Sequence, residues 1–129
     1  MNKTRDRLLE KAKNAKRNSY SPYSKFKVGA AVQSETGKIF SGCNVENSSY
    51  GLSMCAERVA LFKAVSDGHK KIKSIAITSS GKNPTFPCGA CRQVLVEFNP
   101  DMIVYIDKDS SSYMISELLT KSFSKKQLK

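Results

Sequence analysis

Three cysteines occupy positions from which their sulfur atoms could bind one metal ion. Cys88 and Cys91 form a Cys-x-x-Cys pair where a loop enters a predicted helix, and Cys55 lies at the equivalent place on an earlier predicted helix. Helices that follow neighbouring parallel strands begin at the same edge of a sheet, so the three thiols can converge. Three protein ligands leave zinc one open position, as in catalytic rather than structural sites. The spacing therefore predicts a zinc site that can bind a reacting molecule.

Two other residues could in principle join this site. Cys43 could complete a four-cysteine structural site, but it ends a predicted strand, where a small buried apolar residue is the simpler interpretation. His69 is the only histidine, and we expect it at the surface because it lies in a charged turn after a helix. A thioredoxin-like redox pair is the other interpretation of Cys-x-x-Cys, but it leaves Cys55 and Glu57 without a role.

One acidic and one basic residue follow Cys55 closely. Glu57 is two residues further on, about 200° around an ideal helix, so both can reach one site only if Cys55 caps the helix. Glu57 could instead be a first-turn acid favoured by the helix dipole. Arg58 could donate a hydrogen bond to a thiolate and offset the negative charge of three sulfurs on a divalent cation, or it could be an exposed helix arginine. The spacing alone leaves these alternatives open.

Taken together, these residues resemble the zinc signature of the cytidine and deoxycytidylate deaminases. That signature is H/C-x-E followed by P-C-x-x-C, and the chain has Cys-Ala-Glu-Arg at 55–58 and Pro-Cys-Gly-Ala-Cys-Arg-Gln at 87–93. Cysteine as the first ligand is typical of the small homotetrameric branch, and the resemblance covers about residues 18–123. Three more segments are similar to that branch: Ser-Pro-Tyr-Ser-Lys-Phe at 21–26, Val-Gly-Ala-Ala at 28–31 and Gly-Cys-Asn-Val-Glu-Asn at 42–47.

The resemblance implies hydrolytic deamination of cytidine and deoxycytidine to uridine and deoxyuridine, a reaction of pyrimidine salvage. One zinc ion would be held by Cys55, Cys88 and Cys91. Glu57 would carry a proton from the attacking water to ring nitrogen N3. The remaining roles implied are Asn44 and Glu46 on the ribose 3′-hydroxyl, Phe26 against the pyrimidine, the Ala56 backbone on the amide edge of the base, and Arg58 beside the thiolates.

The same branch shares its active sites between subunits, so the resemblance also implies a homotetramer. Phe123 matches an aromatic residue that reaches the pyrimidine in a neighbouring subunit, and Tyr50 is a candidate for a sugar contact between subunits. The usual setting of that aromatic residue is Leu-Leu-Pro-x-x-Phe, whereas Thr120 stands in the proline position here. Because Asn44 and Glu46 suit a ribose, they favour cytidine over blasticidin S, the nearest alternative substrate.

Helices and strands that alternate along the chain must position these residues. The resemblance implies an α/β fold of three layers, α/β/α, in which helices cover both faces of a mixed five-stranded sheet. The order strand, helix, strand over 73–107 predicts a parallel pair, and the last strand should be antiparallel because only about four residues precede it. The apolar spacing predicts helices at 4–18, 55–65 and 89–98, a helical turn at 117–119, and strands at 26–34, 38–43, 73–79, 102–107 and 112–115.

The length of 129 residues predicts one domain over 1–129, with an N-terminal helix within 1–18 and a frayed basic tail at 122–129. The net charge of +11 would attract polyanions, but no aromatic residues interleave with the basic runs. A polynucleotide deaminase is therefore the weaker alternative, and we expect no nucleic-acid partner. Without an apolar run long enough for a bilayer or a signal peptide, the protein should be cytoplasmic, with reduced cysteines and no membrane partner.

Overall fold

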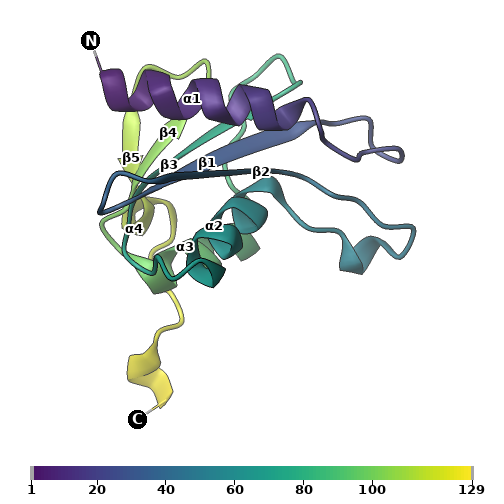
Figure 1. Cartoon of the computed structure of the whole chain (residues 1–129). Coiled ribbons are helices and arrows are strands. Elements are labelled where there is room, and N and C mark those ends of the chain that lie inside the picture. The colour runs from purple at the N-terminus through teal and green to yellow at the C-terminus, as the bar shows by residue number, and fades with distance from the viewer. Residues whose placement is uncertain (1, 129) are drawn as a thin grey trace.

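The computed structural model describes residues 2–128, in which one five-stranded sheet lies between helices (Figure 1). The strands are β1 (Val28–Ser34), β2 (Ile39–Cys43), β3 (Ile72–Ser79), β4 (Ile103–Ile106) and β5 (Ser112–Met114), in the order β2-β1-β3-β4-β5. The α-helices are α1 (Lys3–Lys16), α2 (Ala56–Ser66), α3 (Gly89–Phe98) and α4 (Ile115–Leu118), and two short 3-10 helices are η1 (Tyr50–Leu52) and η2 (Lys125–Leu128). Within residues 2–128, no helix has the length and apolar character needed to cross a membrane.

The strand directions bring the starts of α2 and α3 to one edge of the sheet. Strand β1 is antiparallel to both β2 and β3, so β2 and β3 run in the same direction although they are not neighbours. Helix α2 follows β2 and helix α3 follows β3, which places both helix starts beyond the carboxyl ends of these strands. From the sequence we expected α2 and α3 to follow neighbouring parallel strands. The two helix starts do lie at one edge of the sheet, but β1 separates the parallel strands β2 and β3.

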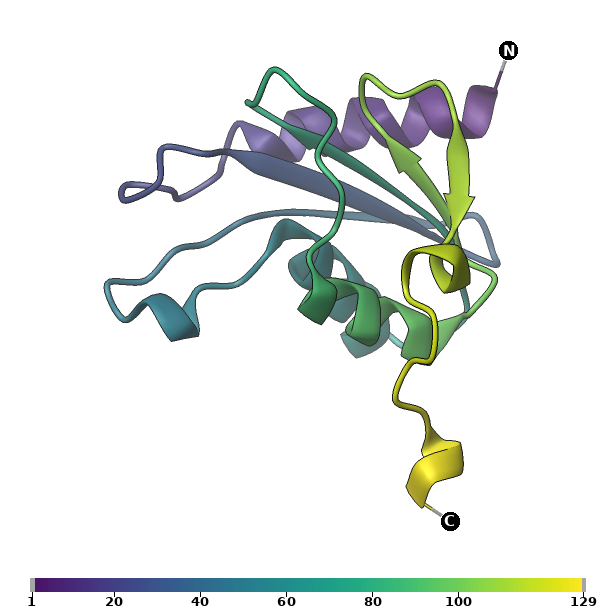
Figure 2. The same ribbon diagram turned by 180° about the vertical axis from the view of Figure 1, so that it is seen from behind.

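The other strand directions confirm the predictions. Strands β3 and β4 are parallel and are joined through α3, and β5 is antiparallel to β4. Helix α1 lies against one face of the sheet and α2 and α3 against the other, as the two opposite views show (Figures 1 and 2). Residues alternate between the two faces along each strand, so that Ala31 and Ala76 contact α1 while Val32, Ile75 and Ile77 pack in the larger core with α2 and α3. The three-layer α/β/α architecture is therefore confirmed.

Several element boundaries differ slightly from the predictions. Helix α1 ends at Lys16 rather than Asn18, and α4 begins at Ile115 because that buried side chain turns into the core directly after β5. The tail forms the 3-10 turn η2 where fraying was predicted, since Gln127 accepts hydrogen bonds from Ser124. Gly37 in the β1–β2 turn and Gly68 after α2 both adopt positive φ angles, of 94° and 91°. Met1 and Lys129 lie outside the described residues.

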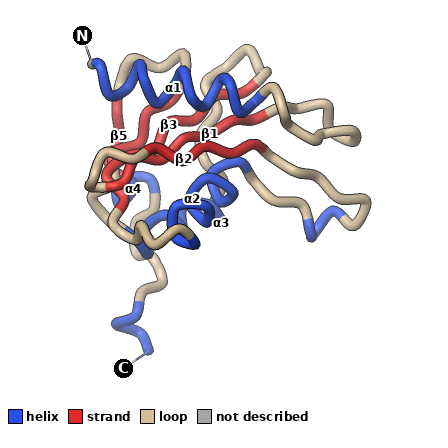
Figure 3. The backbone as a smooth tube through the Cα atoms, in the orientation of Figure 1, coloured by secondary structure: helices blue, strands red, loops and turns tan. Residues whose placement is uncertain are grey.

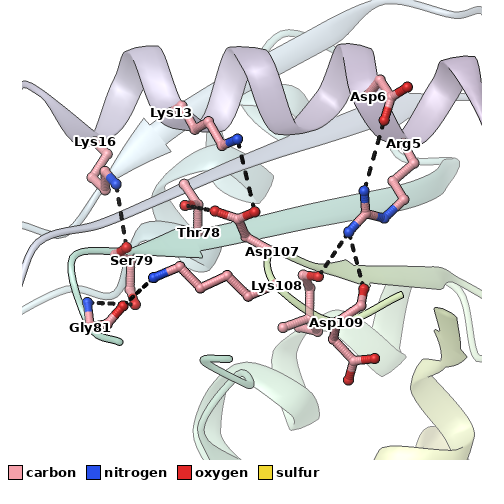
Figure 4. A network of polar contacts seen from close by, with 11 residues as sticks. Arg5, Asp6, Lys13, Lys16, Thr78, Ser79, Gly81, Asp107, Lys108 and Asp109 are labelled. Carbon is pink, nitrogen blue, oxygen red and sulfur yellow. Dashed lines mark hydrogen bonds and ion pairs between the residues drawn. The ribbon is translucent and has the colours of Figure 1, made fainter. Parts of the chain in front are cut away.

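Long loops join the elements at the edge of the sheet where α2 and α3 begin. The segments 18–26 and 44–54, which we call the projecting loops, extend from this edge away from the helices (Figure 3). On the α1 face, basic side chains of the helix bond to the ends of β3 and β4: Lys13 to Asp107, Lys16 to the carbonyl of Ser79, and Arg5 to the carbonyls of Ile106 and Asp109 (Figure 4). The ion pair between Lys13 and Asp107 is partly exposed and adds little free energy. Apolar packing of the buried residues Leu8, Leu9 and Ala12 is therefore the main attachment of α1.

The closest approach of α1 to the sheet is at Gly29. A methyl group at this position would lie 2.0 Å from the carbonyl oxygen of Ala12, a backbone atom that can move only if the whole helix moves. We expect Gly29→Ala to lower the free energy of unfolding by about 1–3 kcal/mol through overpacking, measured by urea denaturation. Gly51→Ala is the matched control, because an added methyl there meets no atom within 4 Å. Equal effects of the two substitutions would contradict this account of the packing.

Candidate metal centre

Both helices at this edge of the sheet begin with a cysteine. Cys55 is the N-cap of α2 and Cys88 is the N-cap of α3, each with extended backbone geometry. This confirms the position of Cys55 that a shared site with Glu57 requires. Cys91 follows in the first turn of α3, and its backbone N–H donates to the Cys88 sulfur over 3.5 Å. Because helix N-termini carry partial positive charge, they favour the thiolate form of cysteines placed there.

The three sulfur atoms fit a zinc ion. All lie within 4.8 Å of one another, and those of Cys55 and Cys88 are 4.0 Å apart. Tetrahedral zinc with bonds of about 2.3 Å would hold its sulfur ligands about 3.8 Å apart, so little movement is needed. Within residues 2–128, no further metal-binding residue, whether histidine, cysteine or an acidic residue, joins these three cysteines. Neither Cys43 nor His69 belongs to the cluster. The donor set therefore suits a three-coordinate protein site with an open fourth position.

A cation next to the cluster offsets its negative charge. The Nη2 atom of Arg58 donates to the Cys55 sulfur over 3.4 Å. Hydrogen bonding from the Cys91 thiol, and then from Arg58, lowers the pKa of Cys55 to about 5. The pKa of Cys91 is raised because its thiol donates to the Cys55 thiolate and because it is buried. The Cys55 sulfur is thus ionised at neutral pH before a metal binds, and metal binding would release the proton of Cys91.

Glu57 is buried beside these sulfurs, with only 5% of its surface exposed. Burial raises its pKa to about 7, and the negative charge of the Cys55 thiolate acts in the same direction. A first-turn acid that serves only the helix dipole would be expected in contact with solvent, where its pKa stays low. A carboxyl group that exchanges its proton near neutral pH is suited to general acid–base catalysis.

A cavity of about 320 Å³ opens onto the sulfurs and Glu57. Its volume is at the lower end of the range for small-molecule sites. Seven of its lining residues are ones that the sequence singled out: Phe26, Asn44, Glu46, Cys55, Ala56, Glu57 and Cys88. The structure thus brings the predicted base, sugar and proton-transfer residues together in one space with two of the three cysteines.

Most of the hydrogen-bonding groups of the Asn44 side chain bond to the protein around this cavity. Its Oδ1 atom accepts from the Val28 backbone N–H over 2.9 Å and from the Ser19 hydroxyl. Its Nδ2 atom donates to the Phe26 carbonyl over 2.8 Å. The amide therefore links Phe26 at the end of its loop and the start of β1 to the residue that follows β2, and one Nδ2 hydrogen remains for a ligand.

Glu46 organises the loop opposite in a similar way. Its Oε1 atom accepts from the backbone N–H groups of Tyr23 and Ser24 over 3.1 and 3.2 Å, and its Oε2 atom accepts from the Ser24 hydroxyl. The Ser24 bonds lower the pKa of Glu46, so the side chain is ionised and can accept further donors from a ligand.

The two residues predicted to act between subunits do not line this cavity. Tyr50 is 74% exposed, and its ring lies 5.8 Å from that of Tyr23 on the projecting loops. Phe123 is 58% exposed in the C-terminal segment, where its backbone is bonded to Gln93. Within one chain, neither ring forms part of the cavity wall, although Tyr50 lines an adjacent pocket that shares Ser24, Glu46 and Ser53 with the cavity.

Two lining residues, Thr85 and Phe86, were not predicted from the sequence, although they directly precede the Pro-Cys pair of the motif. Thr85 and Phe86 form part of the cavity wall. The Thr85 hydroxyl bonds to the hydroxyl of Ser79 over 2.6 Å, and the Phe86 ring packs edge-on against Tyr113 at 5.4 Å. Their position close to the clustered Cys88 was the one available signal, because a loop has no periodicity that would show where its side chains lie.

Comparison with known proteins agrees with this geometry. The family model of the cytidine and deoxycytidylate deaminase zinc-binding region matches residues 2–107. The cytidine deaminase of Sporosarcina psychrophila is 46% identical over 127 residues, covering 95% of this chain and 93% of the relative. That of Halalkalibacterium halodurans is 46% identical over 123 residues, covering 92% and 93%. The crystal structure of cytidine deaminase from Burkholderia pseudomallei is similar with a TM-score of 0.88 and 43% identity, covering 95% of this chain and all of the other.

Removing one of the clustered sulfurs should remove the metal. We expect the wild-type chain to retain one zinc ion after dialysis and Cys88→Ala to bind zinc more than about 100-fold more weakly, since even residues that only support metal ligands contribute 10–100-fold. Atomic emission measures the bound zinc. Cys43→Ala is the control, because this free thiol lies outside the cluster. Undiminished zinc in Cys88→Ala would exclude Cys88 as a ligand.

Proposed function

The chain belongs to the cytidine and deoxycytidylate deaminase family, and on that basis we propose that it hydrolyses cytidine and deoxycytidine to uridine and deoxyuridine with release of ammonia. It is an enzyme acting on the C–N bond of a cyclic amidine. The observation that carries this function is a buried glutamate, Glu57, in the same cavity as cysteines that converge on one point. Identity of 46% to named cytidine deaminases over most of the chain supports it further.

The proposed reaction adds water at C4 of the pyrimidine and expels the amino group. Zinc bound by Cys55, Cys88 and Cys91 would supply Lewis-acid activation of the attacking water. Glu57 accepts a proton from that water and delivers it to ring nitrogen N3; it then takes the proton of the new C4 hydroxyl group and gives it to the amino group, which leaves as ammonia while the carbonyl forms. A pKa of about 7 supports this role, because the group can both take and give a proton at neutral pH.

Substrate contacts follow from the groups that remain available in the cavity. The N–H of Ala56 is at the first position of α2, where helix N–H groups have no partner within the helix, so it can donate to the base. Phe26 offers its ring to the pyrimidine. The free Nδ2 hydrogen of Asn44 and the carboxylate of Glu46 form a donor and acceptor pair for the ribose 3′-hydroxyl. Arg58 stabilises the thiolates rather than touching substrate.

We further propose that the protein acts as one domain in the cytoplasm and assembles as a homotetramer with shared active sites. The projecting loops support assembly, because five large apolar or aromatic side chains on them are 45–74% exposed: Tyr20, Tyr23, Val45, Tyr50 and Leu52. Groups of this kind mark interaction surfaces. A neighbouring chain covering them would also bring Tyr50 or Phe123 close to a cavity whose wall neither residue forms in its own chain.

Assembly can be tested at the projecting loops. We expect light scattering to give a mass of four chains, each of 14.3 kDa. Leu52→Glu places a charge on a side chain that is 70% exposed, and should shift the mass toward smaller species if that side chain is covered by a neighbour. Thr36→Glu adds the same charge in the β1–β2 turn, at the opposite end of β1, and should leave the mass unchanged. A monomeric wild-type protein would refute the tetramer.

The substrate is tested by the loss of ultraviolet absorbance on incubation with cytidine, deoxycytidine, adenosine, blasticidin S or a short cytosine-containing oligonucleotide. We expect turnover of the first two alone. Turnover of blasticidin S alone would shift the assignment to that drug, and turnover of the oligonucleotide alone would refute the nucleoside reaction.

Glu57→Gln is the matched variant for this assay, because it keeps the shape of the side chain but cannot exchange a proton. We expect kcat to fall by about 10²–10⁴-fold while the zinc content stays the same. Retained activity would remove Glu57 from the mechanism.

A further inference from the structure

The motif that contains two of the cysteines continues into two residues to which the reaction assigns no role. Arg92 and Gln93 follow Cys91 in the first half of α3, and neither lines the cavity. Their side chains instead bond to the backbone of the C-terminal segment that carries Phe123. The first turns of α3 thus serve the metal cluster and this segment together.

Arg92 fixes the beginning of the segment. Its Nε atom donates to the carbonyl of Pro87 over 2.7 Å, and its Nη1 atom donates to the carbonyl of Leu118 over 2.7 Å. Pro87 directly precedes the ligand Cys88, and Leu118 is the last residue of α4. One planar guanidinium therefore ties the loop before the metal cluster to the point where the C-terminal segment leaves the body of the protein.

Gln93 fixes the segment again at Phe123 itself. Its Nε2 atom donates to the carbonyl of Phe123 over 2.7 Å, and its Oε1 atom accepts from the N–H of Phe123 over 3.2 Å. The amide side chain pairs with both backbone groups of one residue, as a neighbouring strand would do. Both the position and the orientation of the Phe123 backbone are therefore defined.

The few residues between the two attachments could not hold Phe123 by themselves. Lys121 bends the backbone with a φ of 55°, a conformation that costs free energy for a residue other than glycine. No side chain of residues 119–122 makes a hydrogen bond within the described part of the chain. The Phe123 ring is 58% exposed, so its own packing does not fix it either.

We propose that Gln93 is a positioning residue of the deamination reaction, holding Phe123 so that its ring can complete the nucleoside pocket of a neighbouring chain. The inference rests on the proposed function, in which Phe123 acts between subunits. Without the two bonds to Gln93, the segment would sample other conformations. The free energy needed to order it would then weaken substrate binding. The chemical step depends on Glu57 and the cysteines, which are unaffected.

The test compares steady-state kinetics of three variants on cytidine. Gln93→Met keeps the length of the side chain but makes neither bond, and we expect KM to rise about tenfold while kcat stays within about twofold. Gln93→Glu keeps an acceptor for the Phe123 N–H but places a second acceptor against its carbonyl, so KM should also rise. Gln33→Met is the control, because within residues 2–128 the side chain of this glutamine on β1 makes one hydrogen bond, to the carbonyl of Gly37; the KM of this variant should not change.

A second measurement tests the clamp, meaning the two hydrogen bonds between Gln93 and the Phe123 backbone, without an activity assay. Lys121 and Lys125 flank Phe123, and trypsin should cleave the segment faster in Gln93→Met than in the wild type or in Gln33→Met. Unchanged cleavage would overturn the clamp even if the wild type proved inactive, an outcome that would refute the proposed function separately. If Phe123→Ala raised KM and Gln93→Met did not, the positioning role would be wrong while the deaminase function stood. A fall in kcat at unchanged KM would likewise overturn it.

Discussion

The direction of two strands that do not touch is the constraint on which this site depends. Because β1 is antiparallel to both β2 and β3, the strands on its two sides run the same way and deliver α2 and α3 to one edge of the sheet. Each helix begins with a cysteine, so the convergence of the sulfurs is a consequence of sheet topology and helix capping. Reversing either strand would place its cysteine at the far edge of the sheet.

Charge balance shapes the surroundings of the cluster. Three thiolates on a divalent cation carry excess negative charge, which would weaken the acidification of bound water. Two helix N-termini and Arg58 act against that excess. Burial, with the negative charge of the Cys55 thiolate acting in the same direction, raises the pKa of Glu57 to about 7. The ligand set and the tuning of the glutamate are thus one electrostatic system.

The polar residues around the cavity hold its walls in place and leave some hydrogen-bonding groups free. Asn44 and Glu46 hold the backbone of both walls and keep only part of their hydrogen-bonding capacity for a ligand. Helix α3 likewise carries two cysteines of the cluster and both attachments of the C-terminal segment. The start of α3 therefore supports both the cysteine cluster and the C-terminal segment.

The amino-acid sequence by itself determined the alternation of helices and strands and the cysteine cluster, because apolar periodicity and motif spacing are local properties of the chain. Its resemblance to a known family implied the three-layer fold and the cavity residues Phe26, Asn44, Glu46 and Ala56. Residue spacing left open whether Glu57 was functional or merely a first-turn acid, since only tertiary packing decides which side chains are buried. Nor could it place Thr85 and Phe86 in the cavity wall, because an irregular loop has no repeating pattern. The clamp of Gln93 on Phe123 was decided by the tertiary structure alone: it joins residues 30 positions apart through backbone groups that every residue type possesses.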